Sequence, residues 1–374
     1  MKLLLTNFHD GDGGGHTTYV LALARGLAPR HEVHVAAPEG SRLYREAAAS
    51  LGVHALAQAF PNGLKRLAAR LRARAQLAAY LREHDFDVVH VNGSADHRLV
   101  MSALRGLPQR PRIVLTKHNS KPMTGLGHAW RARRGTDMVI AVCDHTRTEL
   151  AGTAYRRCLH ETVHNGVDIA RYAPWPASQA ATERRRWADD DTLLLGSNAG
   201  TATYKGWMDL VEALAALPTE QRTRVRVLLA GKPPGSEQRA RIEQLGLSAQ
   251  VQFTGLLDDV RPVIAAIDAG FVLSWDVETI SFACREMMAM ARPVLVSNYA
   301  GLPENIQPDI DGWVVPVRDR TAIGAAIQHL LRVRDQLQGM GAAAHAHAQA
   351  EFGLERFVDR TEAAYQRLLD ATPG

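Results

Sequence analysis

The feature that most constrains the fold is a regular alternation of short apolar runs with longer helical patterns. The apolar runs do not alternate with polar residues, which is typical of strands buried on both faces of a parallel sheet. In the first half such runs lie at 2–8, 32–37, 87–91, 112–117 and 138–142, with helical patterns between them, notably at 16–28 and 64–83. A second series has strands at 192–196, 224–230, 250–253, 270–274, 293–297 and 312–316, and helices at 206–217, 236–246, 259–267 and 280–291. This βαβα order predicts a doubly wound α/β sheet in each half.

The chain has 374 residues, which suits two domains better than one. Two prolines interrupt the pattern at 172–179, where the sequence reads YAPWPASQ. We therefore predict an N-terminal Rossmann-like domain over 1–172, a linker over 173–190, a C-terminal Rossmann-like domain over 191–352 and a terminal segment over 353–374. That last segment contains an amphipathic helix at 354–369.

Composition excludes several classes of protein. No apolar run approaches the roughly 18 residues that span a bilayer, and the short apolar start is better interpreted as a buried strand than as a signal peptide. The three cysteines, Cys143, Cys158 and Cys284, form no CxxC or Cys/His cluster, so neither a disulfide framework nor a zinc site is predicted. These features fit a reducing cytoplasm.

Positive charge is concentrated in the first half. Residues 1–175 hold 24 Lys and Arg against 14 Asp and Glu, a net charge of +10, whereas the remaining residues have a net charge of −5. This asymmetry indicates an anionic partner for the first half. A basic amphipathic helix at 64–82, with Leu64, Leu67, Leu71, Ala75 and Ala78 on one face, suggests an anionic membrane surface, and an ordinary solvated helix is the alternative. Nucleic acid is not predicted, because aromatic residues are not interleaved with these charges.

The most informative segment is 274–317, which reads SWDVETISFACREMMAMARPVLVSNYAGLPENIQPDIDGWVVPV. Glu278 and Glu286 in it are separated by seven residues. The segment resembles the E-x7-E signature of the group-1 (GT4-type) retaining glycosyltransferases of GT-B fold. Further landmarks of that family follow in order elsewhere, as a Gly-rich loop at 11–15, HNGVD at 164–168, YKG at 204–206 and FTGLLDDV at 253–260. The resemblance extends over roughly residues 1–365.

The resemblance implies an architecture and an activity. Two Rossmann-like domains would face each other across a cleft, with the acceptor side in the first, the nucleotide-sugar site in the second, and the last helix crossing back to the first. The enzyme would move a sugar, with retention, from a nucleotide-diphosphate sugar to a glycan or lipid-linked acceptor, as in the biosynthesis of lipopolysaccharide or another surface polysaccharide. It would work in the cytoplasm, in some cases at the inner face of the inner membrane, without a metal or other cofactor.

Donor-binding residues are predicted in the second half. The run Thr279, Ile280, Ser281 and Phe282 lies between a strand and a helix, where free N–H groups and the positive helix end suit a phosphate. Ser281 could add a hydroxyl or could merely cap the helix. Lys205 lies at a second strand-to-helix junction as a point charge for the same phosphates, and Asn198 could donate hydrogen bonds there. By resemblance, Glu286 takes the ribose hydroxyls and Glu278 lies near the donor sugar.

Acceptor-side residues are predicted in the first half. Gly14 and Gly15 follow the first strand, where glycine allows close approach to a ligand, and resemblance places their loop beside the donor phosphate and acceptor. Because His16 replaces the third glycine of GxGxxG, a dinucleotide site is a weak alternative. His118 ends the strand at 112–117, where α/β sites form, and by resemblance it lies near the transferred sugar. His90 is interpreted as a core residue.

Two departures from the family leave other functions open. The family usually has an Arg where this chain has Ala199 and Gly200, and Ser281 replaces a glycine of the phosphate loop. The alternatives are a GT-B-fold nucleotide-sugar epimerase, a pyridoxal-phosphate-dependent phosphorylase, an NAD-dependent oxidoreductase and a catalytically impaired glycan-binding protein.

Overall fold

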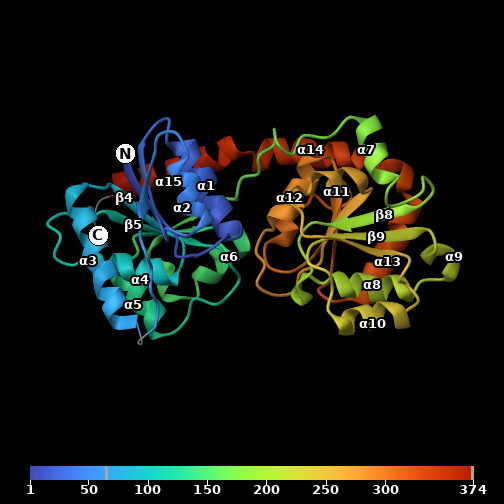
Figure 1. Cartoon of the computed structure of the whole chain (residues 1–374), viewed down its shortest axis with the longest axis horizontal. Helices are drawn as coiled ribbons and strands as arrows, with labels where there is room; N and C mark the ends of the chain where they lie inside the picture. Colours follow the sequence, from blue (N-terminus) through green and yellow to red (C-terminus); the bar gives the residue numbers. More distant parts are fainter. Residues whose placement is uncertain (64–65, 372–374) are drawn as a thin grey trace. The chain divides into compact units, whose positions relative to one another are not determined.

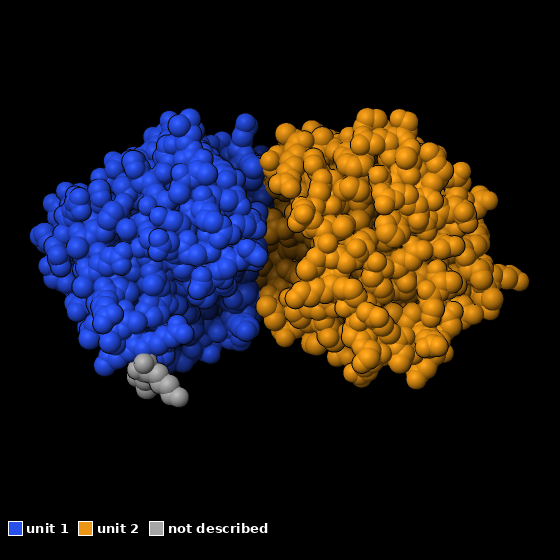
Figure 2. Space-filling model, in the orientation of Figure 1, with its two compact units in different colours: residues 1–166, 354–374 blue, residues 167–353 orange. Residues whose placement is uncertain are grey.

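The computed structural model describes residues 1–63 and 66–371 (Figure 1). The chain divides into two compact units, which Figure 2 distinguishes by colour. Unit 1 comprises Met1–Gly166 together with Leu354–Gly374, and unit 2 comprises Val167–Gly353. The C-terminal segment thus belongs to the same compact unit as the N-terminal half. Residues 167–190, in which the sequence suggested a linker from 173 onward, are part of unit 2 and include a helix.

Unit 1 contains a seven-stranded parallel sheet in the order β3-β2-β1-β4-β5-β6-β7. Its strands are β1 (Lys2–Thr6), β2 (Glu32–Ala37), β3 (Val53–Ala57), β4 (Val88–Val91), β5 (Arg112–Lys117), β6 (Met138–Ala141) and β7 (Leu159–Thr162). Its helices are α1 (Gly15–Leu27), α2 (Arg42–Ala48), α3 (Leu67–Glu83), α4 (Ser94–Ala103), α5 (Leu126–Arg134), α6 (Asp144–Leu150), the short η2 (Ala154–Arg157) and α15 (Leu354–Asp370).

The helices of unit 1 form two layers around the sheet (Figure 1). One layer holds α1, α2 and α15, and the other holds α3, α4 and α5, whose apolar side chains share a core with the sheet. The C-terminal helix α15 buries a stripe that includes Phe357, Val358 and Tyr365, a spacing that places them on one helical face. It packs on α1 so closely that a Cβ at Gly26 would lie 2.3 Å from a methyl of Val358. The terminal helix is therefore an integral part of the unit 1 core.

Unit 2 contains a six-stranded parallel sheet in the order β10-β9-β8-β11-β12-β13. Its strands are β8 (Leu193–Ser197), β9 (Val225–Ala230), β10 (Val251–Gly255), β11 (Ala269–Val272), β12 (Val294–Ser297) and β13 (Gly312–Val315). Its helices are α7 (Ala177–Arg184), α8 (Trp207–Ala215), α9 (Thr219–Arg222), α10 (Ser236–Gln244), α11 (Arg261–Ala266), α12 (Phe282–Ala289), α13 (Arg320–Arg332) and α14 (Leu337–Phe352), with the short η3 (Thr203–Lys205), η4 (Leu302–Asn305) and η5 (Arg334–Gln336).

Alternate side chains of the unit 2 strands feed two separate cores. Leu194 and Leu228 pack with α7, α11, α12 and α14 on one face, whereas Leu193, Leu195 and Leu229 pack with α8, α10 and α13 on the other (Figure 1). Burial on both faces explains why these strands are uniformly apolar in sequence. The predicted α/β fold of two doubly wound parallel sheets is confirmed.

The helix proposed at 64–82 differs from its prediction. Leu64 and Lys65 lie outside the described residues, and the helix α3 runs from Leu67 to Glu83. Its buried face consists of Ala73, Leu77, Ala78 and Leu81, so among the described residues of the predicted apolar face only Ala78 packs inward. Leu67 and Leu71 are 58% and 55% exposed. The predicted face was wrong because the sequence shows two leucine stripes, and the stripe nearer the C-terminus is the one that meets the sheet.

Candidate functional site

In each sheet the chain first adds strands on one side of its first strand and then adds the fourth strand on the other side. In unit 1 the chain builds β1-β2-β3 outward and then returns to place β4 beside β1, and in unit 2 β11 lies beside β8 in the same way. Such a switch point leaves a crevice at the carboxyl ends of the two strands, where open α/β sheets bind ligands. The residues that follow these strands are therefore the first candidates for function in each unit.

In unit 2 the switch point joins Lys205 to Glu278. The Lys205 Nζ lies 2.5 Å from a carboxylate oxygen of Glu278, and both side chains are largely buried. Ser274 Oγ donates to the same carboxylate at 3.4 Å. The loop of Lys205 is tied to the loop after β11 by a hydrogen bond from the Trp275 N–H to the Tyr204 carbonyl, 2.9 Å long. Two sequence-predicted residues 73 positions apart thus form one ion pair.

Gly206 makes this arrangement possible. Its φ is 71°, in the left-handed region, and a Cβ there would lie 2.0 Å from the carbonyl oxygen of Leu273. Any other residue would be both strained and in collision with backbone. The glycine therefore lets the Lys205 turn pack directly on the end of β11, which explains why a glycine follows Lys205 in the sequence.

Glu286 forms the second polar pair of unit 2. It is the fifth of the eight residues of α12 and accepts a 2.6 Å hydrogen bond from Nδ2 of Asn198, a residue that follows β8. The Tyr172 hydroxyl also hydrogen-bonds Glu286. Burial raises the pKa of the Glu286 carboxyl, and the Tyr172 and Asn198 hydrogen bonds oppose that rise. Sequence reasoning named Glu286 and Asn198 but missed Tyr172, which lies in a segment that gave no strand or helix signal.

The loop of residues 279–282 leads into α12 with an unusual backbone. Thr279, Ile280 and Ser281 are buried, and the Ile280 carbonyl accepts a 2.8 Å hydrogen bond from Asn305 Nδ2. Ser281 has φ 53° and ψ 110° and makes no capping hydrogen bond with its side chain. A serine with positive φ is strained, and such strain often marks a functional loop. The alternative that Ser281 merely caps the helix is wrong, and α12 begins at Phe282, two residues later than predicted.

Ala199 and Gly200, where the resemblance led us to expect an Arg, lie in the turn after β8. The Ala199 N–H is hydrogen-bonded to Ser197 Oγ at 3.3 Å, and Gly200 has φ 85°. Neither residue brings a charge to the switch point. Lys205 is therefore the cation that the sequence and the structure both place there.

In unit 1 His118 lies just beyond β5. Its Nε2 is 2.8 Å from Asn92 Oδ1, and Asn92 in turn donates to the Thr6 carbonyl at 3.0 Å, so the imidazole is tied to the end of β1. The ring of His118 lies 4.2 Å from that of His16 and 4.6 Å from that of Tyr19. Burial, together with the other histidines nearby, lowers the pKa of His118 well below its ordinary value. The ring is therefore neutral at physiological pH.

In the glycine-rich loop, the position that requires glycine is not one of the two predicted binding residues, Gly14 and Gly15. Gly14 and Gly15 are exposed at the start of α1, and a Cβ at Gly14 would meet nothing within 4 Å. The residue that requires glycine is Gly13. Its φ is 67°, and a Cβ there would collide with Thr17, at only 2.0 Å from Oγ1. His16, on the first turn of α1, has its pKa lowered to about 4 by burial and by nearby His9.

His90 is a core residue, as predicted. It is fully buried, with its ring nitrogens 2.5 Å from the Tyr365 hydroxyl and 2.5 Å from Thr116 Oγ1. Burial lowers the pKa of His90 to about 3. Its role is to join the end of the sheet to α15.

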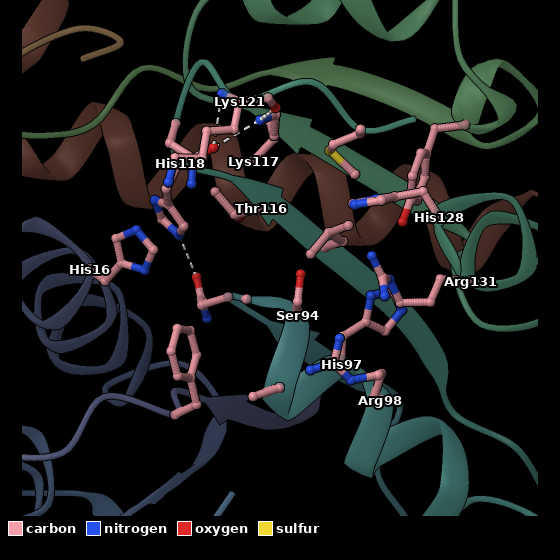
Figure 3. A pocket seen from close by; sticks show the side chains of 18 of the residues that line it. His16, Ser94, His97, Arg98, Thr116, Lys117, His118, Lys121, His128 and Arg131 are labelled. Atoms are coloured by element: carbon pink, nitrogen blue, oxygen red, sulfur yellow. Dashed lines mark hydrogen bonds between the residues drawn. The ribbon is translucent and has the colours of Figure 1, made fainter. Parts of the chain in front are cut away.

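A cavity of about 410 Å³ opens beside His118 (Figure 3). It lies at the carboxyl ends of β4 and β5 and is walled by α4 and α5. Figure 3 shows His16 and His118 on one side and His97, Arg98, His128 and Arg131 on the other. The described residues that line it include four Lys or Arg side chains but no Asp or Glu. Sequence reasoning did not single out Arg131, whose side chain is buried.

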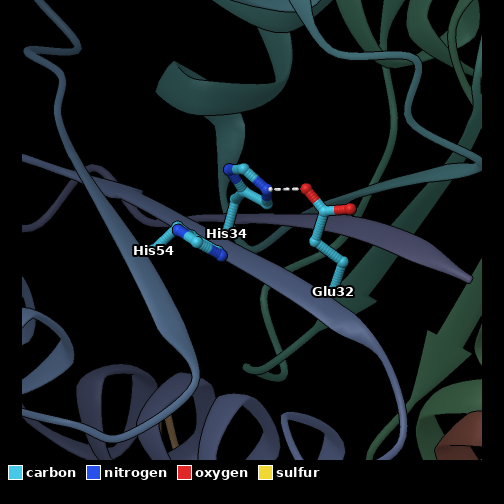
Figure 4. A group of neighbouring side chains, drawn as sticks. All are labelled: Glu32, His34 and His54. Carbon is cyan, nitrogen blue, oxygen red and sulfur yellow. Dashed lines mark hydrogen bonds and ion pairs between the residues drawn. The ribbon is translucent and has the colours of Figure 1, made fainter.

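One group of side chains in the described part of unit 1 has spacing that could suit a metal ion. Glu32, His34 and His54 lie side by side on β2 and β3, with their ligand atoms within 4.8 Å of one another (Figure 4). The Glu32 carboxylate is already bound by Lys2 at 2.9 Å and by the His34 ring at 2.9 Å. None of the three lines the cavity beside His118. Any ion held there would not reach the candidate site of unit 1.

Comparisons with known proteins agree on the fold. The Anabaena protein Alr3699/HepE, solved in complex with UDP, superposes with a TM-score of 0.81 at 20% identity, over 98% of this chain and 100% of that one. The two parallel-sheet units thus define the chain as a protein of GT-B fold.

The sequence comparisons give the family. Residues 13–171 match the model of Glycosyltransferase Family 4, and residues 191–333 match that of Glycosyl transferases group 1. A GDP-mannose-dependent α-(1-6)-phosphatidylinositol monomannoside mannosyltransferase of Mycobacterium tuberculosis is 27% identical, over 94% of each chain. A lipopolysaccharide core biosynthesis glycosyltransferase, LpsE of Rhizobium meliloti, is 28% identical over 45% of this chain and 47% of its own. The chain belongs to the group-1, GT4-type glycosyltransferases and is an enzyme of that kind. No helix in the described part of the chain is long and apolar enough to cross a membrane.

Proposed function

We propose that this glycosyltransferase moves a sugar, with retention of configuration, from a nucleotide-diphosphate sugar to a glycan or lipid-linked acceptor in the biosynthesis of a cell-surface polysaccharide such as lipopolysaccharide. The observation that carries the proposal is the pair of polar contacts at the unit 2 switch point, Lys205 with Glu278 and Asn198 with Glu286. The complexes of Alr3699/HepE with UDP and the name of the Rhizobium relative support the donor class and the pathway.

Each donor-site residue has a role that follows from its chemistry. Glu286 presents carboxylate oxygens that would accept hydrogen bonds from two ribose hydroxyls. The N–H groups of residues 279–282 and the positive end of α12 would hold the diphosphate. Lys205 would neutralise charge on the departing phosphate, which is the main electrostatic demand of the reaction. Before the donor binds, Glu278 holds the ammonium at 2.5 Å and keeps it oriented toward the site.

The reaction would proceed without a bound metal or other cofactor. Lys205, the loop N–H groups and the helix end together supply the positive charge that a divalent ion would otherwise bring. We propose front-face attack, in which the acceptor hydroxyl gives its proton to the departing phosphate, and we assign no carboxylate nucleophile. The neutral His118 ring would accept or donate one hydrogen bond to a hydroxyl of the transferred sugar.

The acceptor side would work in the cytoplasm, peripherally at an anionic membrane. Leu67 and Leu71 are exposed on the same helix as Arg70 and Arg74, a combination that favours the boundary between headgroups and acyl chains. A Leu67→Asp, Leu71→Asp variant should sediment less with anionic vesicles than the native protein. Leu51→Asp, at another exposed leucine of unit 1, is the matched control. Equal sedimentation of all three would contradict a membrane role for α3.

The donor proposal is tested by thermal shift with UDP, GDP, ADP, TDP and CMP and their common sugars. Ligands that bind only the folded state raise its stability by about 2.7 kcal/mol at one hundred times their dissociation constant. One nucleotide series should stabilise the native protein and Glu237→Ala, an exposed control in α10, but not Glu286→Ala. Stabilisation that persists in Glu286→Ala would contradict the role of Glu286. No shift with any nucleotide would favour the alternative of a catalytically impaired glycan-binding protein, which the uncharged Ala199–Gly200 turn keeps open.

Two further measurements address mechanism. The anomeric configuration of the first product, read by NMR, decides between retention and inversion. Activity measured with and without EDTA tests the metal-free proposal, and loss of activity in EDTA, restored by a divalent ion, would refute it.

A further inference from the structure

The cavity of unit 1 carries an excess of positive charge that the proposed reaction does not use. Arg98 on α4, Arg131 on α5, and Lys117 and Lys121 at the end of β5 all line it. The described lining residues contain no carboxylate to balance them. These cations come from three separate elements, so the fold brings them together, and their proximity is not a consequence of one helical repeat.

Arg131 is the clearest sign of a missing partner. Its side chain is buried, with only 5% of its surface exposed, and no Asp or Glu among the described residues pairs with it. Burial lowers the pKa of His97, His128 and Arg98, and the charge of Arg131 lowers each of them further, so the positive groups of this wall repel one another. A buried cation without a counter-ion is costly unless a ligand supplies the negative charge.

Unsatisfied hydrogen-bonding atoms lie in the same wall. The Nδ1 atoms of His97 and His128 are buried and have no hydrogen-bond partner in the protein. Arg98 donates one bond to Asn62 Oδ1, a neutral acceptor, at 2.9 Å. Lys117 donates to Asn119 Oδ1 at 3.0 Å and to the Lys121 carbonyl, and both of these acceptors are neutral. Buried polar atoms without partners are rare in proteins and point to a bound group.

We propose that this cavity binds a phosphate group carried by the sugar acceptor, with Arg131 and Arg98 as its principal ligands and Lys117 beside them. Arginine presents a fork of N–H donors that matches phosphate oxygens. The assignment of this phosphate to the acceptor rests on the proposed function, whereas the phosphate site itself rests on the residues of unit 1 alone. His118 lines the same cavity across from Arg131 (Figure 3), so a headgroup anchored by its phosphate would extend toward the residue assigned to the transferred sugar. The volume of about 410 Å³ is in the range of small-molecule sites.

The test is isothermal titration of the full chain with glucose 6-phosphate, glucuronate, glucose and inorganic phosphate. Glucose 6-phosphate and phosphate should bind, glucose should not, and glucuronate should bind more weakly than the phosphates. Arg131→Gln and Arg98→Gln should each weaken glucose 6-phosphate binding by roughly tenfold or more, since a hydrogen bond to a charged group is worth at least that factor. Arg133→Gln, an exposed arginine two residues from Arg131 that does not line the cavity, should bind normally. Arg98 is only half-buried, so its variant remains informative if Arg131→Gln fails to fold.

The Lys205→Ala variant distinguishes binding at the donor site from binding in the cavity of unit 1. If that variant loses nucleotide binding but keeps glucose 6-phosphate binding, the phosphate site in unit 1 is supported. If it loses both, the phosphate occupied the nucleotide site and the proposal is wrong. Should no nucleotide bind the native protein while glucose 6-phosphate still does, the proposed donor chemistry fails and the phosphate site stands. Equal affinity for glucose and glucose 6-phosphate, or for glucuronate and glucose 6-phosphate, overturns the assignment of phosphate.

Phosphate can come from a soluble sugar phosphate or from a lipid headgroup. Competition distinguishes them. Glucose 6-phosphate should release the protein from vesicles that contain a phosphoinositide if the headgroup enters the cavity, and Arg131→Gln should not bind such vesicles above its binding to phosphatidylcholine. If binding to vesicles is unaffected by either change while soluble ligand binds, the source is a soluble phosphate ester.

Discussion

Ser281 offers a sharp test of the donor loop, because its backbone has a positive φ that favours glycine. With φ 53° and ψ 110° it lies in a region that costs a residue with a side chain about 1–3 kcal/mol. Glycine removes this cost but makes the unfolded chain more flexible, which takes back roughly 0.5–1 kcal/mol. Ser281→Gly should therefore raise the free energy of unfolding by about 1 kcal/mol, or the melting temperature of a unit of this size by roughly 2–4 °C.

A matched serine makes the result interpretable. Ser41 caps α2, with φ −78° and a 3.1 Å hydrogen bond from the Tyr44 N–H, so Ser41→Ala should lower stability by about 1 kcal/mol. Calorimetry or chemical denaturation measures both variants. If the hydroxyl of Ser281 contacts the donor phosphate, Ser281→Gly should also bind nucleotide less tightly although it is more stable. An unchanged or lower melting temperature for Ser281→Gly, with the expected loss for Ser41→Ala, would refute the argument from strain.

Three further predictions follow from the same geometry. Gly206→Ala should lower the free energy of unfolding by roughly 2–4 kcal/mol, because it combines backbone strain with a collision. It should also abolish stabilisation by nucleotides. Gly235→Ala, whose Cβ meets nothing within 4 Å, should be nearly neutral in thermal shift. Burial lowers the pKa of Lys117 to about 8, against the opposing charge of Glu149, so glucose 6-phosphate affinity measured by titration should fall as pH rises above 8 and the ammonium is lost. Unit 1 should lose stability from pH 6.5 to pH 4. The folded-state pKa of His90 is about 3 and those of three further histidines are about 4, all below their unfolded values, so unfolding takes up protons in that window. Asp96, whose pKa is raised to about 7 by burial, acts in the opposite direction but offsets the proton uptake of only one of the four histidines. Denaturant midpoints that do not change between pH 6.5 and pH 5 would contradict this balance.

The interior strands could be predicted from the sequence because they are buried on both faces. Strands β1, β2, β4, β5 and β6 appear within two residues of their expected positions. The edge strands β3 and β7 were missed, since each has only one neighbour and several partly exposed residues, and their sequences VHALA and LHET do not show a continuous apolar run. In unit 1 the edge strands are therefore the part of the sheet that local sequence describes least well, whereas the edge strands β10 and β13 of unit 2 lie close to their predicted positions.

The site residues divide in a similar way. Glu278, Glu286 and Lys205 could be proposed as donor-site residues because they stand in a recognisable order along the chain. That Lys205 meets Glu278, however, depends on the close packing of Gly206 on β11, a contact between distant segments. Arg131 was not singled out from the sequence, because it stands in the run RARR, in which Arg133 and Arg134 are exposed. Which arginine of RARR points inward is decided by the angle at which α5 meets the sheet, and no local pattern records that angle.

The placement of charge in unit 1 changes the meaning of the net charge of the first half. An excess of +10 over residues 1–175 could have been spread over a solvated surface, where each charge contributes little beyond long-range attraction. Four of the cations instead line one cavity, and one of them, Arg131, is almost wholly buried. Keeping a buried guanidinium without a carboxylate lowers the stability of the free protein. A bound phosphate would remove that cost, so ligand binding and the stability of unit 1 should be linked, and Arg131→Leu should be more stable than the native chain in the absence of ligand but less stable when glucose 6-phosphate is present. A variant that is less stable under both conditions would show that Arg131 serves the core and not a ligand.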